Sequence, residues 1–529
     1  MRPRFAFIPA AALFACAPAA VTPPRDAAPD QARDPALIVL ITVDQLRGDY
    51  IDKWGAQLNG GLARLARTGA YYPNAMHDHA ITETAPGHAS VGSGRFPVNT
   101  GIAANSVGVF DQTTQLLERG GPGASPRRFQ GTSIADWLAA RHPSARMVSV
   151  SGKDRGAILP LGRRVADVYW YTPNGRFTTS TYYRTELPSW VRDFNALQVP
   201  QSWAGREWTL LLDDAAYPEA DSVPAESNGQ LFTFPHELSL DPAAAAQMLP
   251  SFPWLDDLTL GFALAAARSM ELGRGARTDL LAVSLSATDY VGHRFGPDSR
   301  ELHDNILRLD RSLGAFLDTL FTMVDQRRVV IALSSDHGVA PMPELAGRHG
   351  ASAARRVTMA PVMAEMRRGL AAAGADSLDV FFGSGALSVN RASLTAARVN
   401  VDSLIRAFSV AAARVTGVAS VSTLEELARR DTTTDHIARR WLHMFRPGGE
   451  VPLVVTLEPF NIWNSLPATH GSPHDYDAHV PVIFWGEPFA PGRHDTRVRV
   501  VDLAPTLARA AGLQPQERLD GRILSEALR

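Results

Sequence analysis

The stretch ALIVLITVD, residues 36–44, decides the fold of this 529-residue chain. Its short apolar run is rich in β-branched residues, which is typical of a strand buried on both faces of a sheet. Four further runs have the same character: RMVSVSG from Arg146, DLLAVSLS from Asp279, RVVIALSSD from Arg328 and HVPVIFWG from His479. Helical patterns such as residues 302–321 lie between the runs. We therefore predict an α/β fold with a central, largely parallel sheet flanked by helices.

Two regions interrupt this alternation of strands and helices. Residues from about 165 to 260, including YWYTPNGRFTTSTYY, are irregular and rich in aromatic residues, and they predict an inserted cap. Residues from about 345 to 460 contain helical patterns around ALSVN and VPLVVTLEP, and they predict a small α/β subdomain. The cap could shape access to a site, or its aromatic side chains could pack a local core. Residues 37–529 are thus predicted to be one domain with two insertions.

The N-terminus has the layout of a secretory signal peptide over residues 1–16, with arginines, an apolar run and then small residues. The sequence LFAC favours a lipobox in which Cys16 is the lipidated first mature residue, although Phe14 is unusual there. Cleavage at residues 17–19 is the alternative. Residues 17–36, rich in Ala, Pro and Asp, predict a flexible tether. We expect export across the inner membrane to the periplasm, with Cys16 as a potential anchor.

Composition excludes several classes of protein. A formal net charge of −2 and an isoelectric point near 6.7 argue against a nucleic-acid groove or a polybasic membrane patch. The only cysteine is Cys16, so the mature chain forms no internal disulfide. No other run of about 18 apolar residues exists, and we predict no transmembrane helix. We expect a monomer whose only contact with a membrane would be a lipid anchor.

The stretch ITETAPGHASVGSGRFPVNTGIAAN, residues 81–105, offers a nucleophile and an amide donor. Thr84 suits a helix N-cap, Pro86 fits the first turn, and the glycines of residues 92–94 end the helix. The free N–H groups of that turn would face a phosphate bonded to the Thr84 oxygen. Asn105 would return beside Thr84 and donate to a phosphoryl oxygen. Taken alone, such a threonine is more often only a cap.

Six candidate metal ligands lie near the predicted strand ends: Asp44, Asp289, His293, Asp336, His337 and His470. The spacing of Asp289 and His293 places both on one face of a helix. Asp336 and His337 are adjacent, so both reach one site only where the strand has ended. The nitrogen and oxygen ligands suit zinc, although manganese or iron could occupy similar sites, and they divide into two sets of three with open positions. Two such metals could activate an attacking oxygen and stabilise a leaving one.

Two other histidines compete with His470. His474 and His479 lie in the same segment, ATHGSPHDYDAHVPVIF, and His479 is the better candidate for a purely structural residue because it starts a strand. Each of these polar residues, taken singly, has common structural uses at strand ends.

The segment SGKDRGA, residues 151–157, places two cations after a strand. Lys153 and Arg155 would reach the same side of an extended segment. A phosphate monoester is dianionic and leaves oxygens free for an arginine fork and a lysine ammonium, whereas a diester has a second organic group there. The pair therefore favours monoesters.

Together the motifs VDQLRGDY, TAPGH with Asn105, GKDRGA, TDYVGH, SDHG and HGSPHDYDAHVP resemble the alkaline phosphatase superfamily. Within it, the chain is similar to the nucleotide pyrophosphatase/phosphodiesterase-related branch and its threonine-nucleophile alkaline phosphatases of the PafA type. The resemblance covers most of the mature chain.

The resemblance implies a catalytic domain with two Zn²⁺ ions. Asp289, His293 and His470 would hold one ion; Asp44, Asp336 and His337 would hold the other, with Thr84 as an additional ligand. It implies hydrolysis of small-molecule phosphate monoesters through a phospho-threonine at Thr84. Asn105, Lys153 and Arg155 would bind the phosphoryl group, and the Lys-x-Arg pair marks the monoesterases.

Four other functions compete with this prediction. A phosphodiesterase or nucleotide pyrophosphatase on the same fold is the main alternative. A sulfatase needs a C/S-x-P-x-R motif, and none is present. A metal-free serine esterase would need the first glycine of the nucleophile elbow, which HASVG and ANSVG lack. A non-catalytic metal-binding envelope protein would have little use for Thr84.

Overall fold

The computed structural model describes residues 34–118, 120–463 and 465–529. The predicted signal peptide, Cys16 and nearly all of the predicted tether lie outside these residues. Within them, no helix is long and apolar enough to cross a membrane.

The central sheet has ten strands in the order β19–β2–β18–β11–β1–β10–β5–β6–β7, with β20 paired to β2. The strands are β1 Leu37–Val43, β2 Ala70–Met76, β5 Met147–Ser151, β6 Asp167–Thr172, β7 Arg176–Thr178, β10 Asp279–Leu285, β11 Val329–Ser334, β18 His479–Trp485, β19 Gly492–Arg493 and β20 Val498–Arg499. β1 lies parallel to β10 and β11, and β5 lies parallel to β10 and β6. β18 runs antiparallel to β11 and β2. The predicted α/β class and largely parallel sheet are confirmed, and all five predicted strands lie in it.

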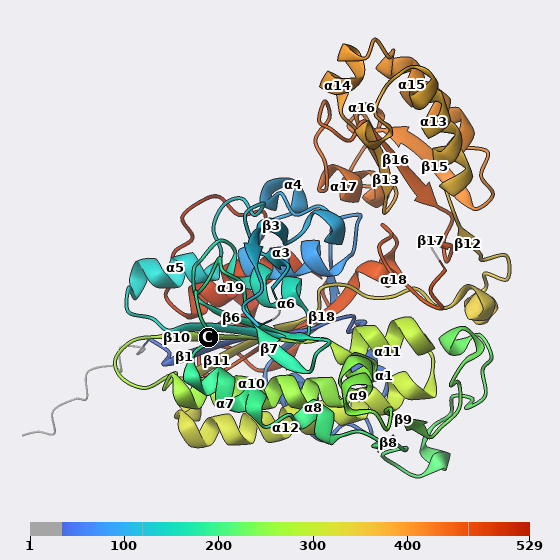
Figure 1. Ribbon diagram of the computed structural model, residues 1–529. Coiled ribbons are helices and arrows are strands. Elements are labelled where there is room, and N and C mark those ends of the chain that lie inside the picture. Colours follow the sequence, from blue (N-terminus) through green and yellow to red (C-terminus); the bar gives the residue numbers. More distant parts are fainter. Residues whose placement is uncertain (1–33, 119, 464) are drawn as a thin grey trace, which may run out of the picture. The chain divides into compact units, whose positions relative to one another are not determined.

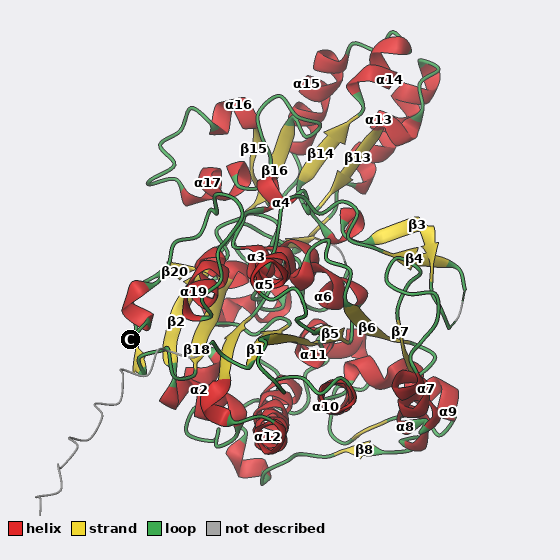
Figure 2. Cartoon of the chain, turned by 90° about the vertical axis from the view of Figure 1, so that its left-hand side faces the viewer, coloured by secondary structure: helices red, strands yellow, loops and turns green. Residues whose placement is uncertain are grey.

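Alternate residues of β1 enter two different cores. Leu37, Val39 and Ile41 pack with residues of α10 (Trp254–Ser269) and α12 (Arg300–Met323). Ile38 and Leu40 join a second core with residues of α3 (Thr84–Ser93), α5 (Ile134–Arg141) and α19 (Leu503–Ala510). Figures 1 and 2 show these two sets of helices on opposite faces of the sheet. A strand covered on both faces needs apolar residues at every position, which explains the unbroken run in the sequence.

The other helices around the sheet complete this architecture. They are α1 Tyr50–Lys53, α2 Gly61–Thr68, α3 Thr84–Ser93, α4 Pro97–Thr100, α5 Ile134–Arg141, α6 Asp154–Ile158, α7 Ser189–Ala196, α8 Val199–Ser202, α9 Pro242–Met248, α11 Ala287–Phe295, α18 Asp475–Ala478 and α19 Leu503–Ala510. Two short hairpins pair β3 (Phe110–Gln115) with β4 (Pro122–Ala124) and β8 (Glu207–Trp208) with β9 (His236–Glu237).

The central sheet extends into the range 165–260 that we predicted as an insertion. β6 and β7 at the start of this range are its last two strands. Aromatic side chains from the range, among them Tyr169, Phe177 and Trp208, are buried in the main core. These side chains pack into the main core and not into the local core that was one of the two alternatives, and a role of the region in access to a site stays a prediction.

Residues 345–460 contain a separate four-stranded antiparallel sheet in the order β13–β14–β16–β15. Its elements are β13 Val380–Gly383, β14 Ala386–Val389, β15 Val418–Thr423, β16 Leu453–Leu457, α13 Ala360–Ala372, α14 Arg391–Ala396, α15 Val401–Ala412, α16 Leu424–Leu427 and α17 His436–Leu442. The sheet and helices α13 and α15 enclose a core of their own. β12 (Arg356–Val357) and β17 (Ile462–Trp463) pair where the chain enters and leaves this subdomain (Figure 1).

Candidate metal centre and phosphate site

The candidate site lies at the carboxyl ends of four neighbouring parallel strands. Asp44 follows β1 directly, and Asp336 and His337 lie just beyond the end of β11. Lys153 follows β5, and β10 leads into α11 with Asp289. Parallel strands bring their carboxyl ends to one edge, so residues far apart in the sequence meet there.

One ligand group consists of Asp289, His293 and His470. Asp289 and His293 lie one turn apart on α11, as their spacing predicted. The Nε2 atoms of His293 and His470 lie 3.3 and 3.4 Å from Asp289 Oδ1 and 3.2 Å from each other. Their donor atoms all lie within 4.8 Å of one another, so the group could hold a metal ion.

The second group consists of Asp44, Asp336 and His337, all fully buried. His337 Nε2 lies 3.4 Å from Asp44 Oδ1 and 3.5 Å from Asp336 Oδ2, and only 3.9 Å from Asp289 Oδ1 of the first group. Asp44 Oδ1 and His337 Nε2 make no hydrogen bond among the described residues. Leaving a buried oxygen or nitrogen lone pair without a partner is costly, and a bound metal ion would pair with these atoms.

Backbone carbonyls orient all three histidines. The Nδ1 atoms of His293, His337 and His470 lie 2.8, 2.9 and 2.7 Å from the carbonyl oxygens of Ala468, Gly338 and Thr82. A carbonyl oxygen can only accept a hydrogen bond, so Nδ1 carries the proton and Nε2 faces the ligand group with its lone pair. This is the arrangement that a metal-binding histidine requires.

Lys153 joins the two groups electrostatically. Its buried ammonium lies 2.6 Å from Asp44 Oδ2 and also contacts Asp289 Oδ2. Although burial opposes the charged form, these two carboxylates raise the pKa of Lys153 above its ordinary value. Burial and the neighbouring carboxylates raise the pKa of Asp44, whereas His293 and Lys153, against the effect of burial, hold that of Asp289 well below its usual range.

The structure corrects the geometry predicted for Lys153 and Arg155. The segment is not extended throughout: Lys153 is the N-cap of α6, and Arg155 lies in its first turn. Arg155 Nε is buried without a hydrogen bond in the described part of the chain, and one Nη lies 3.6 Å from Asp154. Burial opposes the charge of Arg155, but the carboxylates of Asp154 and Asp44 raise its pKa. Both cations therefore act on the same carboxylate-rich site.

Thr84 is the first residue of α3, not its N-cap as we predicted. The N-cap is Glu83, whose backbone is extended and whose own side chain does not cap the helix. The helix ends at Ser93, followed by Gly94 with φ of 67°, as the glycines predicted. Gly87 allows α3 to approach the ligand groups, because a Cβ there would lie 2.1 Å from the backbone oxygen of Asp336.

Asn105 returns to the start of α3, as predicted. Its Oδ1 accepts a hydrogen bond of 2.8 Å from the backbone N–H of Ala85. Because this contact assigns the oxygen, the NH₂ group of the carboxamide is left to donate elsewhere. The two rival histidines lie apart from the ligand groups: His474 and His479 place their Nε2 atoms 2.9 and 2.8 Å from the carbonyls of Leu457 and Pro73.

Sequence reasoning gave no role to two residues that contact the ligands. Gln45 is fully buried with φ of 64°; its N–H donates to Asp336 Oδ1 at 3.1 Å and its Nε2 to Asp289 Oδ1 at 2.7 Å. His88 Nδ1 lies 2.9 Å from the carbonyl of Thr84 and 3.1 Å from Asp336 Oδ2. Gln45 lies in the motif VDQLRGDY and His88 in TAPGH. Their place beside the candidate ligand and nucleophile in these motifs was the signal from which a role could have been predicted.

Comparison with known proteins identifies the family. The model of type I phosphodiesterase / nucleotide pyrophosphatase matches residues 38–379. The chain belongs to this phosphodiesterase/pyrophosphatase family. Alkaline phosphatase PhoV of Synechococcus elongatus is 30% identical over 95% of this chain and 94% of its own length. Alkaline phosphatase PafA of Elizabethkingia meningoseptica is 29% identical over 93% of this chain and 94% of its own.

The solved structure of PafA superimposes on this phosphodiesterase/pyrophosphatase family member with a TM-score of 0.85. It covers 94% of this chain and 99% of PafA at 28% identity. The predicted resemblance to the alkaline phosphatase superfamily is confirmed, and so is the predicted enzyme class, a phosphoric monoester hydrolase. The roles assigned to individual site residues stay predictions.

Proposed function

We propose that the chain is a zinc-dependent alkaline phosphatase that hydrolyses phosphate monoesters through a phospho-threonine at Thr84. The observation that carries this proposal is the position of Lys153, whose ammonium lies between Asp44 of one ligand group and Asp289 of the other. The Lys153 ammonium at that place, together with Arg155 in the first turn of α6, suits the oxygens of a dianionic phosphoryl group.

Each ligand group would hold one Zn²⁺, with Thr84 as a further ligand of the ion at Asp44, Asp336 and His337. When bound, the two ions would supply Lewis acidity for the attacking and leaving oxygens. The orientation of the three histidines and the mixed nitrogen and oxygen donors support zinc.

The chain's own residues carry the two steps. Thr84 Oγ1 loses its proton to solvent and attacks phosphorus in line, so that the Thr84 O–P bond forms while the ester P–O bond breaks, and the leaving oxygen takes a proton from solvent and departs as the alcohol. A water molecule then loses a proton to solvent and attacks the same phosphorus, the Thr84 O–P bond breaks, Thr84 Oγ1 takes a proton from solvent, and inorganic phosphate is released. Asn105 donates to one phosphoryl oxygen, and Lys153 and Arg155 neutralise the charge on the others. Stabilisation of this charge supplies most of the rate enhancement in phosphoryl transfer.

The test compares p-nitrophenyl phosphate with bis-p-nitrophenyl phosphate on the zinc-loaded mature protein, before and after chelation. We expect a large preference in kcat/KM for the monoester, abolished by chelation and restored by zinc. Preference for the diester would instead support a phosphodiesterase or nucleotide pyrophosphatase, the alternative that the description of the family favours. Bound zinc without turnover of either ester would reject both enzymes.

We also propose periplasmic localisation, with lipid attachment at Cys16, and a monomeric state. Fractionation of cells that express the full chain or a Cys16→Ala variant tests the anchor. Mass measurement of the purified protein in solution tests the monomer.

A further inference from the structure

A hairpin of the inserted subdomain contacts the segment that carries the nucleophile. β13 and β14 are joined by Ser384 and Gly385, which have φ of 49° and 82°. Two consecutive residues with positive φ are typical of a type I′ hairpin turn, where Asn and Gly are the favoured residues. Serine at the first position is strained, and retained strain points to a contact that needs that side chain.

The contact is with Glu83, the N-cap of α3. The Ser384 hydroxyl donates to Glu83 Oε1, although 301 positions separate the two residues. Glu83 Oε2 accepts a hydrogen bond of 2.7 Å from the backbone N–H of Asn105. Asn105 Oδ1 in turn accepts from the N–H of Ala85, next to Thr84. One chain of hydrogen bonds therefore runs from the subdomain to the carboxamide of Asn105.

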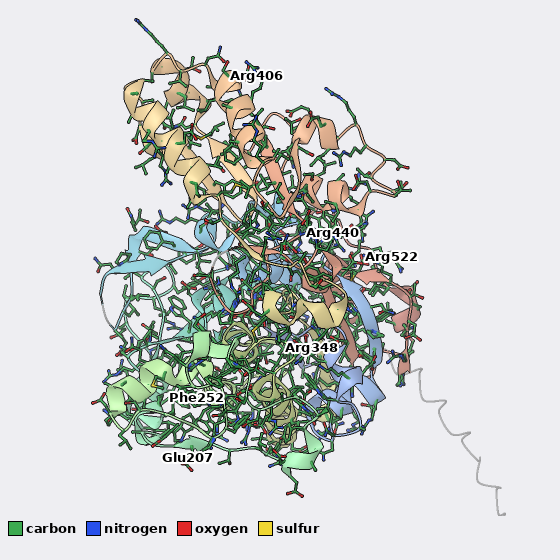
Figure 3. The ribbon with its side chains drawn as sticks, turned by 90° about the vertical axis from the view of Figure 1, so that its right-hand side faces the viewer. Glu207, Phe252, Arg348, Arg406, Arg440 and Arg522 are labelled. Atoms are coloured by element: carbon green, nitrogen blue, oxygen red, sulfur yellow. The ribbon has the colours of Figure 1, made fainter. Side chains whose placement is uncertain are left out.

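Apolar packing also joins the inserted subdomain to the segment around Glu83 and Asn105; we call this contact region the junction. Ala386, at the start of β14, belongs to a buried cluster with Ala80 and Ile81, just before Glu83, and with Trp441 of α17. Ala103 and Ala104, just before Asn105, pack against this cluster. At the same junction the buried guanidinium of Arg440, labelled in Figure 3, donates to the Pro473 carbonyl at 2.6 Å and to Asp475 at 2.7 Å.

We propose that Ser384 and Glu83 are positioning residues that hold Asn105 in place for the phosphoryl group, so that the inserted subdomain completes the phosphate site. This rests on the proposed function, in which Asn105 binds a phosphoryl oxygen. Glu83 holds the backbone N–H of Asn105, and the N–H of Ala85 holds its side-chain oxygen. Together these two hydrogen bonds fix the direction in which the NH₂ group of Asn105 points. Ser384 limits the rotamers of Glu83 from the subdomain side.

Ser384→Gly removes the hydroxyl and preserves the turn, because glycine adopts the positive φ without strain. The variant therefore tests the hydrogen bond to Glu83 separately from the conformation of the hairpin. We expect the variant to unfold at the same temperature as the wild type or higher. Its kcat/KM for p-nitrophenyl phosphate should nevertheless fall about tenfold, and its affinity for inorganic phosphate, measured by calorimetry, should fall by a similar factor. Ser388→Ala, on the next strand of the same hairpin, is the matched control and should change neither quantity. Unchanged phosphate affinity in Ser384→Gly would overturn the proposal.

Glu83 provides the second test. In Glu83→Gln the amide oxygen can accept from Asn105 N–H and the amide NH₂ can donate to the Ser384 hydroxyl, so we expect activity within about threefold of the wild type. Glu83→Ala should lose at least tenfold. In an Asn105→Ala background, Ser384→Gly should have no further effect, since both changes act on one interaction. Additive losses would overturn the role assigned to Ser384.

Failure of the proposed function would be recognised separately. If the zinc-loaded wild type does not hydrolyse the monoester, the phosphatase proposal fails, but phosphate affinity still decides whether Ser384 and Glu83 position Asn105.

Discussion

Gln45 has a strained backbone conformation at the candidate metal centre. It is a non-glycine residue with φ of 64°, and it bonds to ligands that lie 244 and 291 positions away. Such strain costs about 1 to 3 kcal/mol and persists only where the surroundings enforce it. Here the main-chain N–H holds Asp336 and the side-chain amide holds Asp289, so Gln45 sets the distance between the two ligand groups.

We expect Gln45→Ala to weaken zinc binding about 10- to 100-fold, because ligands without their supporting hydrogen bonds are less well oriented. Competition with a coloured chelator measures this affinity without reference to turnover. Gly292→Ala should have a similar effect by another route, since a Cβ there would lie 1.8 Å from Gln45 Oε1. Gln201→Ala, whose amide bonds to the Asn174 carbonyl, is the control. Unaltered zinc affinity in both site variants would contradict this role.

Arg155 decides between two substrate classes in the proposed mechanism. Arg155→Ala should lower kcat/KM for monoesters roughly 30- to 1000-fold. This fall corresponds to a loss of about 2 to 4 kcal/mol of transition-state stabilisation. A diester, with an organic group in place of one free oxygen, should lose far less. Exposed Arg163, eight positions further along the chain, supplies the control variant Arg163→Ala. Equal losses on monoester and diester would show that Arg155 does not set specificity.

At the scale of elements, helix α11 is supported by a carboxylate of α10. Asp256 is 2% exposed, and its Oδ1 accepts a hydrogen bond of 3.0 Å from Ala287 N–H at the start of α11. Its Oδ2 has no hydrogen-bond partner in the described structure, and burial raises the pKa of Asp256 to about 7. The folded state therefore favours the protonated carboxyl, and stability is lost as the pH rises from the unfolded pKa through the folded one.

Asp256→Asn removes this titration and keeps the acceptor oxygen. The advantage of asparagine over aspartate should therefore grow by about 2 to 3 kcal/mol between pH 5 and pH 8. Urea unfolding at the two pH values measures the difference. A constant difference between variant and wild type would mean that Asp256 titrates normally in the folded protein.

At the scale of the whole molecule, the proposed metal ions join segments from the entire length of the chain. The two ligand groups draw on residues from Asp44 to His470, and their buried carboxylates carry charge that a bound cation would neutralise. A ligand that binds only the folded state stabilises it by RT ln(1 + L/Kd), where L is the free ligand concentration. Metal removal should therefore affect stability as well as turnover.

We expect chelation to lower the unfolding temperature by several degrees and zinc to restore it. Thr84→Ala should abolish turnover but keep most of this zinc-dependent stabilisation, because six other ligands remain. Differential scanning calorimetry of the wild type and of Thr84→Ala, each with and without chelator, tests both expectations. An unfolding temperature that does not respond to zinc would contradict a metal centre built from these residues.

The sequence alone was enough for five strands of the sheet and for the residues of the two candidate ligand groups. Strands buried on both faces are encoded locally as apolar runs, and β1, β5, β10, β11 and β18 all lie where such runs predicted them. The i, i+4 spacing of Asp289 and His293 and the glycines after α3 are also local signals. Each depends on the few residues around it, so each could be inferred without knowledge of the fold.

Only the tertiary structure decided how these elements meet. It placed Thr84 after the cap, put Lys153 at the start of a helix between two carboxylates, and brought β6 and β7 into the central sheet. The contacts of Gln45 with Asp289 and of Ser384 with Glu83 join residues 244 and 301 positions apart. Such contacts follow from the packing of whole elements, and no pattern within either segment specifies the partner in the other.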